Sequence, residues 1–220
     1  MMATEQTKQL LGKAANVAIV CNQDEPAAVS AALALFYTLR EAGKNVNLMI
    51  DRVPETISFL IPSAEFLQTP RNFVLSIPRT AAEVSQIYYE KSEERLNIHL
   101  TLAHGRMKKE QIDFYAQEPK PDAIIALGIK NFKREMEQRL NEFGFLLTAP
   151  IINIDTATGN EKYGTENLVE PSSLAEISLD LLKDINEPKI TKAAAECLMA
   201  ALIIAYDNFQ RETAGERAFD

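Results

Sequence analysis

Acidic side chains stand where two apolar segments of the sequence end. Asp24 and Glu25 follow the run VAIVC at 17–21, and Asp155 ends the segment PIINID at 150–155. Continuous apolar runs of this length are typical of strands buried on both faces of a parallel sheet. Because ligands bind beyond the carboxyl ends of such strands, we expect any chemistry of this chain to lie where these carboxylates meet.

A helix is predicted directly after the first pair of carboxylates. Pro26 suits the first helical position, and Gly43 stands where a C-cap glycine is expected. The free N–H groups of Ala27 and Ala28 favour a phosphate group, which Glu25 would repel unless a cation lies between them. This segment therefore predicts an anion site that depends on a neighbouring positive charge.

The rest of the chain alternates strands and helices around this unit. A strand at 46–50 follows the first helix, and a right-handed crossover between parallel strands is implied. Between Pro54 and Pro62 a short helical turn is predicted to carry Ile57, Phe59 and Leu60 inward. Further elements are predicted as a strand at 123–127, a helix at 132–143, a strand at 150–155, a loop-rich segment at 156–169, a helix from 171 to about 183 and a central apolar helix at 193–205. We predict an α/β fold, a parallel sheet with helices on both faces.

One region departs from this pattern. Between 72 and 116 the apolar residues alternate, which predicts an inserted antiparallel hairpin or meander within a single domain, 1–220. Leu96, Ile98, Leu100 and Leu102 are predicted to share one covered face. The two histidines of the chain also fall here, and no role is assigned to either.

Composition limits the classes of function. The chain has 220 residues, a formal net charge of -8 and 46% hydrophobic residues. The acidic balance makes nucleic-acid binding unlikely, and no run approaches the roughly 18 apolar residues of a membrane span. With no hydrophobic signal core at the N-terminus, we expect a cytoplasmic protein without a membrane partner. Cys21 and Cys197 lie in apolar segments, as reduced thiols do.

Four segments together resemble the DHH phosphoesterase superfamily, which includes oligoribonucleases and nucleotide phosphatases. They are IVCNQDEPAAVSAALAL, PDAIIALGIKN, IINIDTATGNEKYGTENLVEPSSLAEI and CLMAALIIAYDNFQ. Their order and spacing are similar to the N-terminal, metal-binding domain of that family. The resemblance implies a two-metal phosphoesterase fold whose substrate-binding C-terminal domain has no counterpart in this chain.

The ligand set that the resemblance implies is only partly present. The loop histidine falls on Cys21 and the first loop aspartate on Glu25, while Asp155 keeps the aspartate of the signature. Asp24 neighbours this set, and Asn160 matches the asparagine that follows the signature. At the remaining positions where the family has metal ligands, this chain has residues that do not replace them: Ala27, Gly128, Thr156, Ala157 and Ala205. We therefore expect metal ligands to be limited to Glu25 and Asp155, with Cys21 as a soft third, and ligand contacts at Asp24, Glu25, Ala27, Ala28 and Asn160.

Three functions remain open at this stage. The first is a catalytically inactive, DHH-like pseudoenzyme that needs no cofactor and binds a small phosphorylated ligand or a protein partner. The second is a diverged phosphoesterase that uses a single Mg²⁺ or Mn²⁺ on short oligonucleotides or nucleotides, with Glu25 and Asp155 as its catalytic candidates. The third is a structural homo-oligomer that assembles through 72–116. In the first and third, the two carboxylates are remnants of the fold at a solvated sheet edge.

Overall fold

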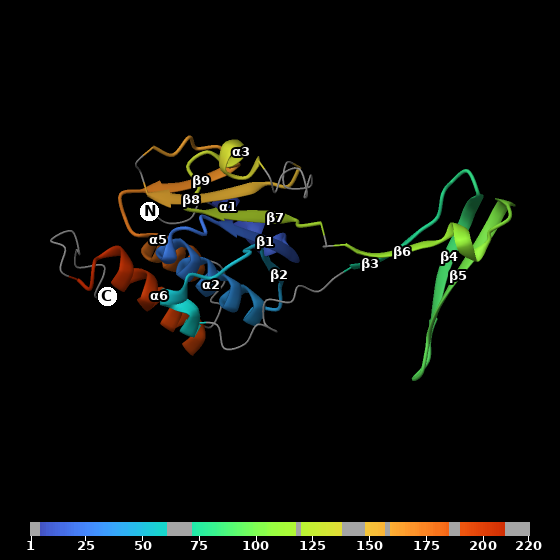
Figure 1. Cartoon of the computed structure of the whole chain (residues 1–220), viewed down its shortest axis with the longest axis horizontal. Helices are drawn as coiled ribbons and strands as arrows, with labels where there is room; N and C mark the ends of the chain where they lie inside the picture. The colour runs from blue at the N-terminus through green and yellow to red at the C-terminus, as the bar shows by residue number, and fades with distance from the viewer. Residues whose placement is uncertain are drawn as a thin grey trace. The chain divides into compact units, whose positions relative to one another are not determined.

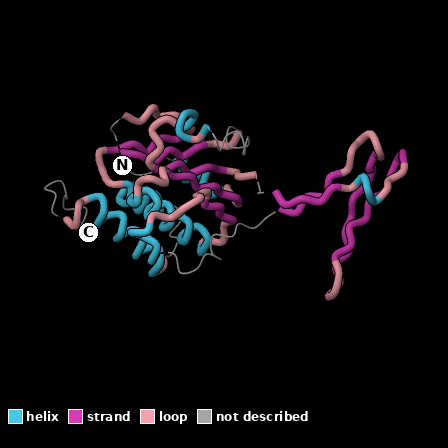
Figure 2. Tube along the Cα trace, viewed as in Figure 1, coloured by secondary structure: helices cyan, strands magenta, loops and turns pink. Residues whose placement is uncertain are grey.

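The structure, a computed structural model, describes residues 5–60, 72–117, 120–137, 148–156, 159–184 and 190–209. It divides into two compact units. Unit 1 comprises 1–70 and 120–220, and unit 2 comprises 71–119. The described α-helices all belong to unit 1, whereas unit 2 is built of strands and one short 3-10 turn (Figure 2). No described helix is long and apolar enough to cross a membrane.

Unit 1 contains a five-stranded sheet in which every neighbouring pair of strands is parallel. The strand order is β2-β1-β7-β8-β9. The strands are β1 (Asn16–Cys21), β2 (Asn45–Leu48), β7 (Ala123–Leu127), β8 (Ile151–Thr156) and β9 (Glu166–Glu170). The central strand β7 is buried at every position, as its apolar sequence AIIAL requires. The predicted parallel α/β fold is confirmed.

Helices cover the two faces of this sheet unequally. One face packs against α2 (Pro26–Glu41), α5 (Leu174–Asp184) and α6 (Lys192–Ala205), which lie together on one side of the sheet in Figure 1. The opposite face carries the short α3 (Phe132–Glu135) with Met136 and Tyr163. The N-terminal α1 (Glu5–Lys13) contacts β9 through a hydrogen bond from Thr7 to Glu166, and α5 through an ion pair from Lys8 to Asp184.

Local sequence explains where the two C-terminal helices start. At α5 the buried Glu176 accepts hydrogen bonds from the Ser173 N–H (3.0 Å) and the Ser173 hydroxyl (2.7 Å) in a capping box. Tyr206, just beyond α6, donates a further hydrogen bond to Glu176 (2.5 Å) and ties the two helices together. Burial raises the pKa of Glu176, but the hydrogen bonds from Tyr206 and the serines outweigh it and hold that pKa below its usual value. Thr191 caps α6.

Unit 2 consists of two antiparallel strand pairs. β3 (Asn72–Ser76) pairs with β6 (Asp113–Gln117), and β4 (Ala82–Lys91) pairs with β5 (Leu96–Gly105). A turn at Ser92 to Arg95 joins β4 to β5, and the 3-10 turn Lys109–Gln111 precedes β6. These strands fall where the inserted antiparallel β region was predicted.

The structure differs from the prediction in four details. The segment 156–169 is not all loop, because β9 begins there as a short edge strand with only Leu168 fully buried. Phe59 is 73% exposed, since the helical turn Glu55–Leu60 is a 3-10 helix whose three-residue repeat puts Ile57 and Leu60 on the buried side. Helix α6 is not buried all round: Met199 is 51% exposed. The face of β5 predicted to be covered is partly open, with Leu96 61% and Ile98 52% exposed.

Two other expectations are only partly described. The predicted helix 132–143 begins at Phe132 as expected. Its last part, with residues 138–143, lies outside the described residues. Ala157, one of the positions matched to the DHH signature, also lies outside them.

Candidate functional site

The topological switch point of the sheet lies between β1 and β7. From this boundary the sheet continues through β1 and β2 on one side and through β7, β8 and β9 on the other. The connections after β1 and β7 therefore lead toward opposite edges of the sheet. At such a switch point the loops after the two strands separate and leave a crevice at their carboxyl ends. The Asn22 N–H donates to Leu127 O (3.0 Å), and the Gly128 N–H donates to Ile154 O (3.0 Å). The loops after β1, β7 and β8 are thereby fixed side by side.

Asp155 stands at the end of β8 and is the most buried carboxylate of this edge. It is 3% exposed, and its two oxygens accept separate hydrogen bonds. Oδ1 accepts from the N–H of Thr156 (2.8 Å), and Oδ2 accepts from Asn160 Nδ2 (2.8 Å). These two bonds fix the orientation of the carboxylate in the native fold.

Asn160 is the centre of a partly buried amide network that supports Asp155. Besides Asp155, its Nδ2 donates to the carbonyl oxygen of Ile129 (3.0 Å). Its Oδ1 accepts from Asn153 Nδ2 (2.7 Å) and from the Lys162 N–H (2.7 Å). Asn153 in turn donates to Asn167 Oδ1 on β9 (2.9 Å). Asn160 thus positions Asp155 and joins three segments of the edge.

Glu25 immediately precedes α2 and lies at the same carboxyl edge of the sheet as Asp155. Its backbone is extended, and its side chain makes no capping hydrogen bond. Partial burial raises the pKa of Glu25, and the negative charge of Asp155 raises it further, while the ammonium group of Lys130 lowers it. A second acidic neighbour, Glu135, adds a smaller increase. The structure therefore brings the two predicted carboxylates, Glu25 and Asp155, within electrostatic reach of each other.

Gly128 closes the space where the DHH resemblance implies a third carboxylate. Its φ is +65°, a conformation that a residue with a side chain rarely adopts. A Cβ at this position would lie 3.2 Å from the Ala28 Cβ, 3.4 Å from Glu25 Oε2 and 3.4 Å from a methyl carbon of Leu174. An aspartate here would strain the backbone, and Ala28 would have to shift slightly to make room for its Cβ.

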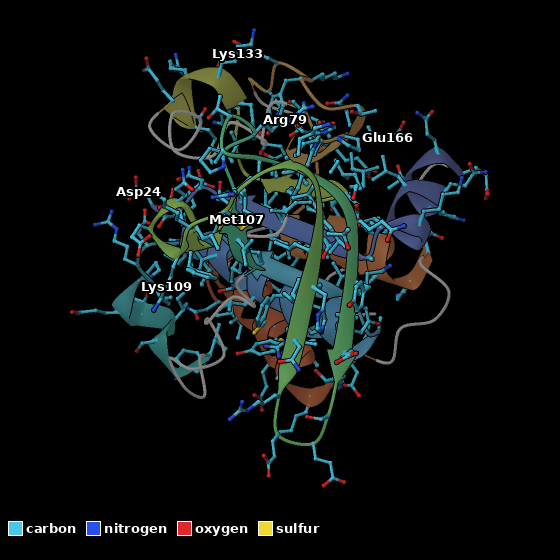
Figure 3. The ribbon with its side chains drawn as sticks, turned by 90° about the vertical axis from the view of Figure 1, so that its right-hand side faces the viewer. Asp24, Arg79, Met107, Lys109, Lys133 and Glu166 are labelled. Carbon is cyan, nitrogen blue, oxygen red and sulfur yellow. The ribbon has the colours of Figure 1, made fainter. Side chains whose placement is uncertain are left out.

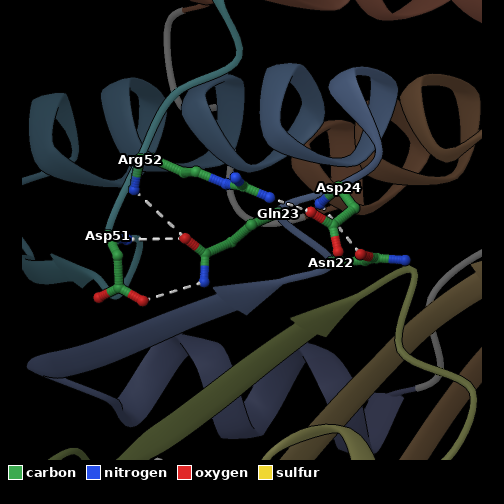
Figure 4. Close-up of polar contacts among 5 residues, drawn as sticks. All are labelled: Asn22, Gln23, Asp24, Asp51 and Arg52. Carbon is green, nitrogen blue, oxygen red and sulfur yellow. Dashed lines mark hydrogen bonds and ion pairs between the residues drawn. The ribbon is translucent and has the colours of Figure 1, made fainter.

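Asp24 has a separate environment. It forms an ion pair with Arg52, on the segment after β2, and its N–H donates to Asn22 Oδ1 (3.1 Å). Gln23 links the same two loops, because its Oε1 accepts from the Asp51 N–H (2.7 Å) (Figure 4). Asp24 is thus held toward Arg52, and the carboxylate that interacts with Asp155 is Glu25.

The remaining predicted site residues lie on β1 and the first turn of α2. Cys21 ends β1 and is 5% exposed. Ala27 is half-buried and Ala28 is buried, in the turn whose N–H groups face the carboxyl edge of the sheet. The short side chain of Ala28 matters for packing, since it lies against Gly128.

Sequence reasoning missed Lys130, Glu135 and Tyr163. Glu135 Oε1 accepts from the N–H groups of Lys130 (3.1 Å) and Asn131 (2.8 Å). The Tyr163 hydroxyl donates to Ile129 O (3.0 Å), and burial, followed by the charges of Asp155 and Glu135, raises the pKa of Tyr163 strongly. Lys130 follows the predicted strand 123–127 by three residues, so the carboxyl-edge rule could have found it. Tyr163 lies in an irregular segment and carried no signal.

A two-metal centre does not fit the residues that the structure describes. Among them, no group of three or more His, Cys, Asp or Glu side chains could hold a metal ion. Two divalent ions about 4 Å apart need a dense set of carboxylates and imidazoles. At this edge the described side chains that act on one another are three carboxylates, Glu25, Asp155 and Glu135, and the ammonium group of Lys130.

No protein family profile matches the sequence, and no curated protein is significantly similar to it. Solved structures do share the fold. One is an exopolyphosphatase-related protein from Bacteroides fragilis, which superposes with a TM-score of 0.63 at 14% sequence identity. The alignment covers 99% of this chain but 55% of that protein, so the chain spans little more than half the length of its neighbour. At this identity the comparison shows that the two proteins share an α/β fold.

Proposed function

We propose that this protein is a DHH-like phosphoesterase scaffold that binds a small phosphorylated ligand without hydrolysing it. The observation that carries the proposal is the composition of the carboxyl edge at the β1/β7 switch point. Lys130 and the N-terminus of α2 can attract phosphate there, while the positive φ of Gly128 disfavours a side chain where the family places another metal ligand. The resemblance to the DHH superfamily and the fold shared with an exopolyphosphatase-related protein support the ligand class.

The electrostatics of Glu25 favour phosphate binding when the Glu25 carboxyl group is protonated. The raised pKa of Glu25 means that its carboxyl group takes up a proton more readily than a free glutamate does. A protonated Glu25 no longer repels an anion and can donate a hydrogen bond to a phosphate oxygen. Lys130 supplies the positive charge that the predicted anion site requires.

Hydrolysis lacks the groups that would support it. Cleavage at phosphorus needs an activated hydroxide and stabilisation of the charge that develops on the phosphoryl oxygens. Lys130 can contribute to the second requirement. Among the described side chains, Glu25 and Asp155 are too few ligands to hold two metal ions.

A single-metal phosphoesterase is the alternative, and the closeness of Glu25 and Asp155 favours it. Mg²⁺ keeps several waters and is often held by one or two carboxylates, so this pair fits one such ion better than it fits two. When bound, such an ion would polarise a phosphoryl oxygen and lower the pKa of a coordinated water. The chain's own contribution would be to orient the ion, through the Asn160 network that fixes Asp155.

Calorimetric titration tests the binding proposal. The probes are a dinucleotide, whose phosphodiester does not titrate near neutral pH, and pyrophosphate, each with and without Mg²⁺. We expect weak binding that Lys130→Gln abolishes, because its ammonium group acts at the site, and that the matched control Lys133→Gln on α3 leaves unchanged. Equal effects of the two substitutions, or no binding by the wild type, would contradict the proposal.

A turnover assay separates the two functions. Short oligoribonucleotides, cyclic dinucleotides, 3′,5′-bisphosphates and short polyphosphates are incubated with Mn²⁺ or Mg²⁺. We expect no hydrolysis. Turnover that disappears in both Glu25→Gln and Asp155→Asn would establish the single-metal enzyme instead, and turnover that survives both changes would place the activity outside this site.

A further inference from the structure

The hairpin of β4 and β5 has one polar and one apolar face. The register pairs Ile87 with Leu100 and Tyr89 with Ile98. The alternation of side chains along a strand therefore gathers seven apolar residues on one face: Val84, Ile87, Tyr89, Leu96, Ile98, Leu100 and Leu102. On the opposite face Tyr88 stacks on His99, with ring centroids 4.5 Å apart, and His99 forms an ion pair with Glu90. The seven residues are called the apolar face below.

The apolar face is exposed in the single chain. Ile87 is 70%, Tyr89 73%, Leu96 61% and Ile98 52% exposed. An isolated two-stranded hairpin is marginally stable in water, and burial of its exposed apolar side chains is favourable. The described contacts of unit 2 provide no cover for these residues. A binding partner would therefore stabilise both the interface and the hairpin itself.

We propose that a second copy of this chain covers the apolar face, with the two hairpins packed face to face and antiparallel. The two-fold axis lies between the faces, perpendicular to the strands and near the Ile87–Leu100 pair, which is midway along the hairpin. The turn of each hairpin then lies against the base of the other. A face whose central residues are apolar is complementary to itself in such an isologous contact, and Lys91, opposite Leu96, lies at the turn end of this face.

Charge selects the antiparallel orientation. The base of the hairpin, residues 79–83 and 104–110, has four basic residues (Arg79, Arg106, Lys108 and Lys109) against two acidic ones (Glu83 and Glu110). The turn end, residues 90–95, has three acidic residues (Glu90, Glu93 and Glu94) against two basic ones (Lys91 and Arg95). Figure 3 shows Arg79 and Met107 at the end of the hairpin away from its turn. Antiparallel packing brings opposite charges together, whereas a parallel arrangement would bring like charges together.

Face-to-face packing also fits better than pairing through a strand edge. The register of β4 shifts between Glu83 and Val84 and again between Val84 and Gln86, and such irregularities hinder the addition of a further strand. Edge pairing would, moreover, leave the apolar face in water.

The oligomeric state tests the proposal directly. Light scattering and sedimentation equilibrium of the wild type at micromolar concentrations are expected to show a dimer. The double variant Ile98→Asn, Leu100→Asn should be a monomer with unchanged helix content, because the α-helices belong to unit 1. The matched double variant Gln86→Asn, Thr101→Asn on the polar face should remain a dimer. A monomeric wild type, or equal dissociation of the two double variants, would overturn the proposal.

Cross-linking and charge exchange test the orientation. The two native cysteines, Cys21 and Cys197, are buried in unit 1, so they give little background. Leu100→Cys, near the two-fold axis, should form a disulfide between copies, whereas Leu96→Cys, near the turn, should not. Glu93→Lys with Glu94→Lys should weaken the dimer at least tenfold, and adding Arg106→Glu with Lys108→Glu should restore it. Preferential cross-linking through Leu96→Cys would show a parallel arrangement and refute the proposal.

Discussion

The central sheet of unit 1 and the hairpin of unit 2 both contain strands rich in apolar residues, but these residues are buried in the sheet and exposed in the hairpin. In β7 all five residues are buried, because the strand lies between β1 and β8 and both faces are covered. In β5 no residue is buried, although Leu96, Ile98, Leu100 and Leu102 alternate as regularly as in any half-buried strand. Apolar sequence alone therefore does not make a core. What differs is the number of neighbours that the topology gives each strand.

This comparison predicts unequal costs for the same substitution in the two units. Ile125→Ala in β7 removes a fully buried side chain from the core and should lower the free energy of unfolding by about 2–5 kcal/mol. Ile87→Ala, at a residue that is 70% exposed, should leave the unfolding of unit 1 unchanged. Urea titrations followed by far-UV circular dichroism, which detects the helices of unit 1, measure both. Equal losses in the two variants would show that the units unfold as one.

Substitutions of polar side chains should likewise cost more stability in unit 1 than in unit 2. Asn160→Ala leaves Asp155 Oδ2 and the Lys162 N–H without their partner and should cost about 1–3 kcal/mol. Asn97→Ala, on the polar face of the hairpin, should change stability by less than about 0.5 kcal/mol, as surface substitutions usually do. The same urea titrations apply. A neutral Asn160→Ala variant would mean that the amide network does not position Asp155.

The smallest expected effect concerns the raised pKa of Glu25. The folded state disfavours the charged form of Glu25, so this ionised carboxylate lowers the stability of the fold at any pH above the folded pKa. The loss of stability disappears as the pH falls toward 4.5, the ordinary pKa of the group. Glu25→Gln should therefore raise Tm at neutral pH by on the order of 1–2 °C, since the side chain is exposed on one side and its charge is partly screened. The gain should vanish near pH 4.5. Thermal melts across this range measure the difference.

The central part of the fold could be predicted because its sequence pattern and its environment agree. Strands 17–21 and 123–127 are continuous apolar runs, and such runs are stable only when covered on both faces. Strand β9 escaped prediction because an edge strand with one buried leucine carries almost no periodic signal. The exposure of Phe59 depends on the three-residue repeat of a 3-10 helix, which the sequence does not distinguish from an α-helical turn.

The candidate site was predictable to the extent that it follows the strand ends. Glu25 and Asp155 were found because carboxyl ends of parallel strands meet at one edge. Glu25 was preferred to Asp24 as a metal ligand because of its position in the resemblance, whereas the ion pair that holds Asp24 toward Arg52 left no signal in the sequence. Tyr163 approaches the site through an irregular segment, and no local pattern predicts the path of such a segment.

The pairing of β3 with β6 has a consequence for the order of folding. β1 must pair with β7, and the register partners Val17 and Ala123 are far apart in the sequence. Once Asn72 has paired with Gln117, the residues between them are already looped out. The loop that must close to bring β1 to β7 is then shorter by that segment. Loop closure costs roughly 0.6 kcal/mol for each doubling of loop length, so early formation of this pair would lower the entropic cost of joining β1 to β7 by about 0.5 kcal/mol. The insertion can therefore act as a stem that shortens the search for the central strand pair.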